Sequence, residues 1–387
     1  MHWNEMNCPA NLQLDQSEPS LFYISEKPVP NFILPDDITC IIYHPLTLNG
    51  TPGTPINNAI KTAIMEFIKL HDCTDSGNIT ELAPESLERF LSVPCYVGIL
   101  RQKEKIIGTM FTVLLRVGFR QETNSGELQH ESVKEIEILT SYTTFLCIDK
   151  SFRDKGLAMA LIRSIMKAGE TQYGSRSGYY MTYETHHTIN NKIESWYRPL
   201  NVKRAVDCGF VLESFARKGD RVAAIRQKMA YHIPKPSIIP RKVNVNDYRK
   251  VLPILKRGRL YLNPTLKEFG FLCKCFDIYI VERSLKAANN IGSDGLFMLF
   301  PMTSVISSTK KRVYNAQLAY MIGDLLPSAL WVANNEEYDL MYGWCGGDIT
   351  VDRVRSVRGL ITTAASYVEF YNVRELIPNN QLMLPLF

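Results

Sequence analysis

The chain has 387 residues, of which 45% are hydrophobic and 21% are charged, and these proportions are typical of globular rather than disordered proteins. Its formal net charge is only +5 and it has no block of five or six basic residues, so we expect no nucleic-acid partner. The nine cysteines are scattered and odd in number, which argues against a disulfide framework and favours a reducing, cytoplasmic location.

The N-terminus lacks the features of a targeting segment. Residues 1–20 are polar and are predicted to be a mobile segment, and no basic stretch leads into an apolar run, so we expect no secretory signal. The longest apolar stretches, Ile106–Val117 and Leu296–Ile306, are shorter than the roughly 20 residues that cross a bilayer. We therefore expect no transmembrane segment, and we expect a monomer.

The first half begins with helical periodicity and continues with segments rich in β-branched and aromatic residues. In chain order, the predicted elements are a helix over Ile56–Leu70, a short helix from Pro84, strands over Tyr96–Leu100, Ile106–Val117 and Glu135–Ile148, a helix over Gly156–Gln172, a strand over Tyr179–Tyr183, a loop over 184–194 and a short helix capped by Asn201. The residues between the second and third strands, Gly118–Lys134, are expected to form a long inserted loop.

The second half repeats this mixed character after a proline-rich stretch, 232–241, which we interpret as a linker. The predicted elements are a helix over Val245–Tyr261, strands over Phe276–Val281, Leu296–Phe300, Ala316–Ile322 and Leu340–Trp344, and a helix over Val354–Phe370. The pattern predicts an α+β protein with largely antiparallel sheets, divided into a domain over 21–231 and a domain over 242–387.

One strand–turn–helix segment carries a candidate binding motif. After the strand that ends at Ile148, the chain reads R-x-x-G-x-A, with Arg153, Gly156 and Ala158 leading into the predicted helix. A glycine allows close approach of the backbone to a ligand, and the start of a helix presents free N–H groups with partial positive charge. With Arg153 and Lys155 beside it, this turn is a candidate cradle for a pyrophosphate.

The motif resembles the coenzyme A-binding motif of the GNAT acetyltransferase superfamily, and further segments resemble the N-myristoyltransferases. Trp196–Asn201 is similar to the W-H-R-x-L-N segment of that family, Tyr23–Pro30 to its F-W-x-T-Q-P-V-P segment and Leu296–Pro301 to its F-x-S-F-Y-x-L-P strand. The resemblance implies two fused GNAT-like halves, each with a mixed, mostly antiparallel sheet flanked by helices.

The resemblance also implies site residues. The backbone N–H groups of Phe145 and Leu146 would polarise the thioester carbonyl of the donor as an oxyanion hole. The residues expected to contact acyl-CoA are Tyr23, Ile24, Phe145, Leu146, Cys147, Ile148, Arg153, Asp154, Lys155, Gly156, Leu157 and Ala158. The residues expected to contact the acceptor are Thr144, Tyr197 and either Tyr180 or Tyr183. Myristoyl-CoA or another acyl-CoA would be a co-substrate, with no permanently bound cofactor and no metal.

The implied reaction is direct attack by the N-terminal glycine amine of a peptide or protein on the acyl-CoA thioester. That amine has a pKa near 8, so a base must assist its deprotonation. In the family the base is the chain's own C-terminal carboxylate, which would here belong to Phe387. The family's terminal strands are not recognisable in the sequence, so the resemblance implies a shortened C-terminus.

Three polar positions also depart from the family pattern, and one of them is the residue after the groove tyrosine, where Met181 or Glu184 stands in place of the usual threonine. Thr144 stands where asparagine is usual, and Tyr197 stands where histidine is usual. These departures leave two alternatives open: a GNAT N-acetyltransferase acting on another amine, and a degenerate acyl-CoA-binding protein without catalysis.

Overall fold

The computed structural model describes residues 21–23, 33–71, 83–122, 133–182, 191–207, 233–282, 294–305, 311–371 and 373–375, and it confirms the α+β class. The helices are α1 Asn58–His71, α2 Pro84–Leu91, α3 Leu157–Tyr173, α4 Val202–Asp207, α6 Tyr248–Leu255, α7 Leu266–Cys275, α8 Leu326–Asn335 and α9 Val351–Ser356, with short 3-10 turns η3 Lys150–Phe152 and η5 Val245–Asp247. Among these described helices, none is both long enough and apolar enough to cross a membrane.

The strands are β1 Leu21–Tyr23, β2 Ile38–Leu46, β3 Pro52–Thr54, β4 Cys95–Gln102, β5 Lys105–Glu122, β6 Val133–Ile148, β7 Ser177–Thr182, β8 Asn191–Pro199, β9 Arg241–Lys242, β10 Leu260–Leu262, β11 Asp277–Val281, β12 Gly295–Val305, β13 Arg312–Ile322, β14 Leu340–Trp344, β15 Leu360–Tyr371 and β16 Val373–Glu375. Fourteen of them form one sheet in the order β3-β2-β4-β5-β6-β7-β15-β8-β14-β13-β12-β11-β9, with β10 beside β5. β1 and β16 pair separately as a two-stranded sheet.

The sheet consists of two halves with the same internal order. In the first half β2, β4, β5 and β6 are antiparallel neighbours, and β7 runs parallel to β6. In the second half β9, β11, β12 and β13 are antiparallel neighbours, and β14 runs parallel to β13. Each parallel pair is joined by one helix, α3 in the first half and α8 in the second. This repetition confirms the expectation of two similar α+β halves.

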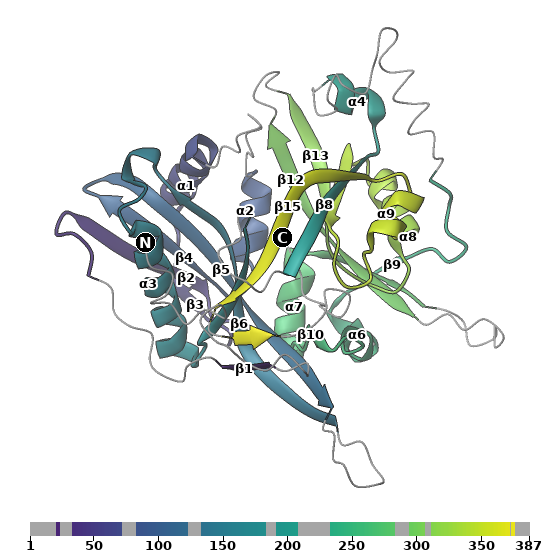
Figure 1. Cartoon of the computed structure of the whole chain (residues 1–387), viewed down its shortest axis with the longest axis horizontal. Coiled ribbons are helices and arrows are strands. Elements are labelled where there is room, and N and C mark those ends of the chain that lie inside the picture. The colour runs from purple at the N-terminus through teal and green to yellow at the C-terminus, as the bar shows by residue number, and fades with distance from the viewer. Residues whose placement is uncertain are drawn as a thin grey trace.

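The two halves exchange one strand at the centre of the sheet. β8 belongs to the first half in sequence but pairs with β14, and β15 belongs to the second half but pairs with β7. β8 and β15 also pair with each other, and Figure 1 shows them crossing the middle of the molecule in teal and yellow. The domain boundary at 232–241 stays a prediction.

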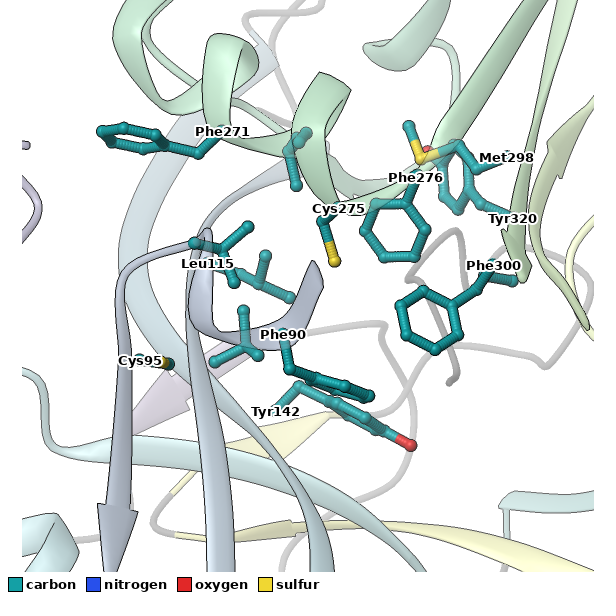
Figure 2. Packing of buried hydrophobic residues seen from close by; sticks show 14 of the residues in the cluster. Phe90, Cys95, Leu115, Tyr142, Phe271, Cys275, Phe276, Met298, Phe300 and Tyr320 are labelled. Carbon is teal, nitrogen blue, oxygen red and sulfur yellow. The ribbon is translucent and has the colours of Figure 1, made fainter. Parts of the chain in front are cut away.

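Helices cover both faces of the sheet. α1, α2, α6 and α7 pack on one face, here called the α2/α7 face, which carries the largest apolar core. Figure 2 shows Phe90 of α2 and Cys275 of α7 meeting Tyr142, Phe276 and Phe300 there. α3 covers the opposite face in the first half, and α8 and α9 cover it in the second. The same face of the sheet therefore continues from one half to the other.

Several sequence predictions of secondary structure were wrong. The helix expected over Val354–Phe370 is a short helix, α9, followed by the strand β15, so strands are present at the C-terminal end where none was recognised. The helix expected over Val245–Tyr261 ends at Leu255 and gives way to β10. β8 begins inside the expected loop 184–194, β9 lies at the end of the expected linker, and β5 and β6 extend into the expected insertion Gly118–Lys134.

Candidate active site

The regular pairing of β5 and β6 is interrupted at Phe145. Thr109 pairs with Cys147 and Phe111 pairs with Thr144, so β6 has one residue more than β5 between these two pairs. Phe145 has a φ of 50°, a left-handed conformation that is uncommon for a bulky residue. The Thr109 hydroxyl donates a hydrogen bond to the Phe145 carbonyl at 3.4 Å. The extra residue makes a β-bulge, a device that redirects backbone groups at the bulged strand.

The core holds this bulge in place through the Phe145 ring. The ring centroid lies 5.5 Å from that of Phe90 and 5.7 Å from that of Phe111, both in edge-on geometry. Phe90 and Phe111 are fully buried, whereas the next residue, Leu146, is 41% exposed. The side chain of the bulge is thus fixed in the interior while the chain beside it reaches the surface.

β6 and β7 separate immediately before the bulge. Their parallel pairing covers Thr140–Thr143 on β6 and ends at the pair formed by Thr143 and Tyr180. β6 runs on to Ile148, and β7 continues to Thr182 beside β15 instead. The backbone edge of residues 144–146 that faces β7 is therefore not covered by it. An unpaired strand edge accepts an extended chain that carries amide groups, and the pantetheine arm of coenzyme A is such a chain.

The predicted cradle follows directly after β6. The 3-10 turn η3 leads to Asp154, with a φ of 61°, and to Gly156, with a φ of 78°, which is the N-cap of α3. α3 has no acidic residue in its first turn. Two left-handed residues turn the chain sharply, and the first N–H groups of a long helix carry partial positive charge. This combination suits a pyrophosphate group.

Two cationic side chains belong to the cradle. Both Arg153 and Lys155 are exposed. The Arg153 guanidinium donates hydrogen bonds to the carbonyls of Ile148 at 3.2 Å and His71 at 3.4 Å, so it ties the loop to β6 and α1. The Lys155 ammonium lies 4.8 Å from the centre of the Phe152 ring. Lys155 is therefore the cation whose replacement disturbs the loop least.

Asp149 organises the base of the loop. Its carboxylate is almost completely buried and accepts hydrogen bonds from the Ser151 amide at 3.0 Å, the Ser151 hydroxyl at 2.8 Å and the Lys105 ammonium at 2.7 Å. Nε2 of His71 lies 3.9 Å from the same carboxylate. The Lys105 bond is the main reason that the pKa of Asp149 lies well below its usual range. Burial lowers the pKa of His71.

The hydrogen bond from the Ser151 amide to Asp149 could be predicted from the local sequence. An aspartate two residues before a serine is typical of a turn in which the carboxylate accepts the later amide. His71 and Lys105 lie far away in sequence, and no spacing links them to Asp149. Only the packing of α1 and the start of β5 against the loop brings them there.

The corresponding turn of the second half is built differently. It lies between β13 and α8 and contains Gly323, with a φ of 90°. The Gly323 amide donates a hydrogen bond to the Asp348 carboxylate at 2.7 Å, and Asp324 and Asp348 both pair with Arg353 at 3.4 Å. A carboxylate of the chain itself thus occupies the position at which an anion would bind. Of these two turns, the one in the first half suits an anionic ligand.

The remaining predicted site residues lie at varied positions. Leu157, Cys147 and Ile148 are buried, and Ala158 is partly buried at the start of α3. Thr144 lies on the α2/α7 face, as does Phe111, with which it pairs. Tyr179 also packs on that face, so its neighbour Tyr180 on β7 lies on the opposite face. Tyr197 lies on β8, where burial raises its pKa. The backbone of Tyr23 pairs with that of Val373. Ile24, Tyr183 and Phe387 lie outside the described residues.

The exposed lysine of the cradle provides a test of anion binding. We expect Lys155→Ala to weaken coenzyme A binding about tenfold, because a hydrogen bond to a charged group is worth about 1.5–3 kcal/mol and exposure reduces that value. Isothermal titration calorimetry measures the Kd, and Lys235→Ala, which removes another exposed lysine, from the segment before β9, is the control. Equal Kd values for the two variants would contradict a role for Lys155.

Comparisons with known proteins place the fold. No protein-family model matches the chain, and no curated protein matches it in sequence. Its structure matches that of Saccharomyces cerevisiae N-myristoyltransferase with bound myristoyl-CoA, with a TM-score of 0.73 and 15% identity over 96% of this chain and 92% of the yeast chain. A second structure of the yeast enzyme, with bound myristoyl-CoA and inhibitors, gives a TM-score of 0.74 and 15% identity over 99% and 94% of the two chains. The chain thus has the double GNAT-like fold of N-myristoyltransferase.

Proposed function

We propose that the protein is an acyl-CoA-dependent N-acyltransferase that moves a fatty acyl group, with myristoyl as the expected one, to the N-terminal glycine amine of a peptide or protein. The observation that carries this proposal is the placement of two features on one strand: β6 has a bulge at Phe145 and leads directly into the Arg153–Ala158 cradle. A thioester donor needs both, since its anionic end must be held while its carbonyl is polarised.

The proposed reaction uses backbone groups for binding and for polarisation. The cradle would hold the pyrophosphate of acyl-CoA, and the pantetheine arm would run along the edge of residues 144–146. The N–H groups of Phe145 and Leu146 would stabilise the negative charge that develops on the carbonyl oxygen, an effect of roughly 2.7–4 kcal/mol per donor in other enzymes. The glycine amine forms the new C–N bond, the C–S bond breaks, and coenzyme A leaves as a thiolate.

The proton of the attacking amine needs an acceptor. The C-terminal carboxylate of Phe387 is the proposed base. The strands β15 and β16 support this proposal, because β15 lies next to β7 at the centre of the sheet and β16 pairs with β1. The amine proton would pass to that carboxylate as the C–N bond forms. A cytoplasmic location, where acyl-CoA and nascent protein N-termini meet, is part of the proposal.

Acyl transfer to a short peptide tests the proposal. A glycine-initiated peptide and the same peptide with an acetylated N-terminus are incubated with myristoyl-CoA or acetyl-CoA, and the products are identified by mass spectrometry. We expect myristoylation of the free peptide alone. Transfer from acetyl-CoA only would favour an acetyltransferase, and binding of acyl-CoA without any transfer would indicate a protein that binds the donor without catalysis.

A further inference from the structure

An apolar groove runs between α7 and the segment that leads into η5. Its volume is about 660 Å³, and its lining residues are Val243, Asn244, Val245, Leu266, Lys267, Gly270, Phe271, Cys273 and Lys274. Leu266 is 54% exposed and Val245 is 42% exposed, so large apolar side chains of both walls are open to solvent. Exposed apolar side chains that gather in one hollow are typical of an interaction site.

The glycine of α7 keeps this groove open. Gly270 lies inside the helix, where glycine is about 1 kcal/mol less favourable than alanine. A Cβ atom at Gly270 would lie 3.5 Å from a methyl carbon of Val245, which is an ordinary contact, so the local packing does not exclude alanine. A longer side chain would extend between α7 and η5 and fill the groove.

The charged residues that line the groove are both basic. Lys267 and Lys274 are exposed, and neither forms an ion pair within the described part of the chain. Asp247 at the end of η5 and Glu268 of α7 lie nearby, but each of these carboxylates pairs with an arginine. A segment that combines apolar side chains with carboxylates would therefore complement this surface.

The first 20 residues of the chain have this composition. They contain three carboxylates and no lysine or arginine, and their apolar side chains include Trp3, Met6, Leu12 and Leu14. They precede β1, which forms three residue pairs with β16 in a sheet separate from the main one. Two strands this short are marginally stable by themselves, so a contact that holds the preceding chain would stabilise them.

The groove is within reach of this segment. β15 leads into β16 and is four strands from β10 in the order β15-β7-β6-β5-β10, which corresponds to about 19 Å. β16 pairs with β1, and α7 begins at Leu266, shortly after β10 ends at Leu262. Figure 1 shows β1 towards the same end of the molecule as β10. Twenty residues span up to about 66 Å when extended, so they can reach α7 from β1.

We propose that residues 1–20 bind in this groove of their own chain, with their apolar side chains against α7 and η5 and their carboxylates beside Lys267 and Lys274. The groove is thus a docking site that anchors the chain before β1. Binding is reversible, because exposed ion pairs contribute less than about 1 kcal/mol each. The inference does not depend on acyl transfer, because the groove shares no lining residue with the bulge or the cradle.

A full-length variant with an altered N-terminal segment tests the docking. In this released variant Trp3, Leu12 and Leu14 are changed to serine, and Glu5, Asp15 and Glu18 are changed to the corresponding amides. A fluorescein-labelled peptide with the natural sequence of residues 1–20 is titrated by anisotropy against the released variant and against the unchanged chain. We expect at least about tenfold tighter binding to the released variant, because the tethered segment of the unchanged chain competes at a high effective concentration. Equal Kd values, tighter binding to the unchanged chain, or no binding to either protein would overturn the inference.

Substitutions in the groove of the released variant locate the binding. Gly270→Leu fills the groove with a residue that favours helix, and Lys267→Glu with Lys274→Glu reverses the charge of its rim. Each change is expected to weaken peptide binding at least about tenfold. Lys203→Glu reverses an exposed lysine on α4 and is the control, which should leave the Kd unchanged. If Gly270→Leu fails to fold, the two exposed lysines still decide the result. Groove variants that bind the peptide as tightly as the control does would place it elsewhere and overturn the inference.

Sedimentation velocity distinguishes docking within one chain from exchange between two copies. We expect the sedimentation coefficient of the unchanged chain to be independent of protein concentration. A concentration-dependent dimer that the released variant does not form would place the segment in the groove of a second copy, and this result would overturn docking within one chain.

Discussion

Gly156→Val is expected to weaken acyl-CoA binding about 100-fold, which corresponds to about 2.7 kcal/mol. Gly156 has a φ of 78° at the N-cap of α3. A left-handed conformation costs a residue with a Cβ atom about 1–2 kcal/mol, so the loop relaxes and its amides lose their alignment. The valine methyl groups would also lie where the phosphates approach. Isothermal titration calorimetry with coenzyme A and with myristoyl-CoA measures the loss.

The same helix provides a matched control for this variant. Gly174 is its C-cap and has a φ of 68°. Apart from its chain neighbours and the backbone of α3, no atom of the described residues lies within 4 Å of the position that a Cβ would take. Gly174→Val should reduce the free energy of unfolding by about 1–2 kcal/mol, as Gly156→Val does, because the conformational cost is similar. It should leave the Kd for coenzyme A unchanged. A similar loss of binding in both variants would mean that only the stability of α3 matters.

Asp149→Asn is expected to reduce the free energy of unfolding at pH 7 by about 1–3 kcal/mol, the usual cost of breaking a buried hydrogen-bonded charge. The amide oxygen can still accept from Ser151, but the charged bond to Lys105 is lost. Denaturant unfolding at a series of pH values measures the difference from the unchanged chain. Asp352→Asn, whose carboxylate is 95% exposed, is the control and should change stability little.

The pH dependence of this difference has a definite sign. The folded-state pKa of Asp149 lies well below its usual range, chiefly because Lys105 donates to it. Its contribution is therefore complete above the unfolded pKa near 3.9 and is lost as the pH falls below that value, because the unfolded chain takes up the proton first. The difference between the two proteins should shrink from pH 5 to pH 2. A constant difference would show that the carboxylate charge contributes nothing.

The strand–turn–helix geometry of the candidate cradle was predictable because its signal is local. A strand, a basic turn with glycine and an amphipathic helix follow one another between Phe145 and Ala158, and α3 begins one residue after the predicted start at Gly156. The bulge had no such signal. Phe145 adopts a left-handed conformation that phenylalanine rarely takes, and its neighbours Phe90 and Phe111 fix it through packing between distant segments.

The exchange of β8 and β15 between the two halves was the feature of the fold that was hardest to predict from the sequence. The residues of β15 were predicted to form the second part of a helix, but they form a strand between β7 and β8. The prediction was wrong because the preference of a segment for a strand depends on the strands beside it, which are distant in sequence. β8 was interpreted partly as a loop for the same reason, since its partners β14 and β15 come more than 140 residues later along the chain. Local patterns identified the elements of each half but could not predict their exchange.

The exchange also corrects the prediction about strands near the C-terminus. The sequence suggested that the terminal strands were missing, whereas β15 and β16 are present and β16 pairs with β1. Phe387 itself lies outside the described residues, so its role as base stays a proposal. The proposal gains support from the route of the chain, because β15 passes beside β7 at the point where β7 leaves β6.

A crystal structure with a non-hydrolysable myristoyl-CoA analogue is the most direct measurement of whether the turn after β6 holds the donor. We expect the pyrophosphate to lie against the amides of Gly156, Leu157 and Ala158, with the carbonyl oxygen of the analogue within hydrogen-bond distance of the N–H of Phe145 or Leu146. A donor bound with its phosphates at any other segment, or a cradle left without phosphate in a fully occupied complex, would contradict the account.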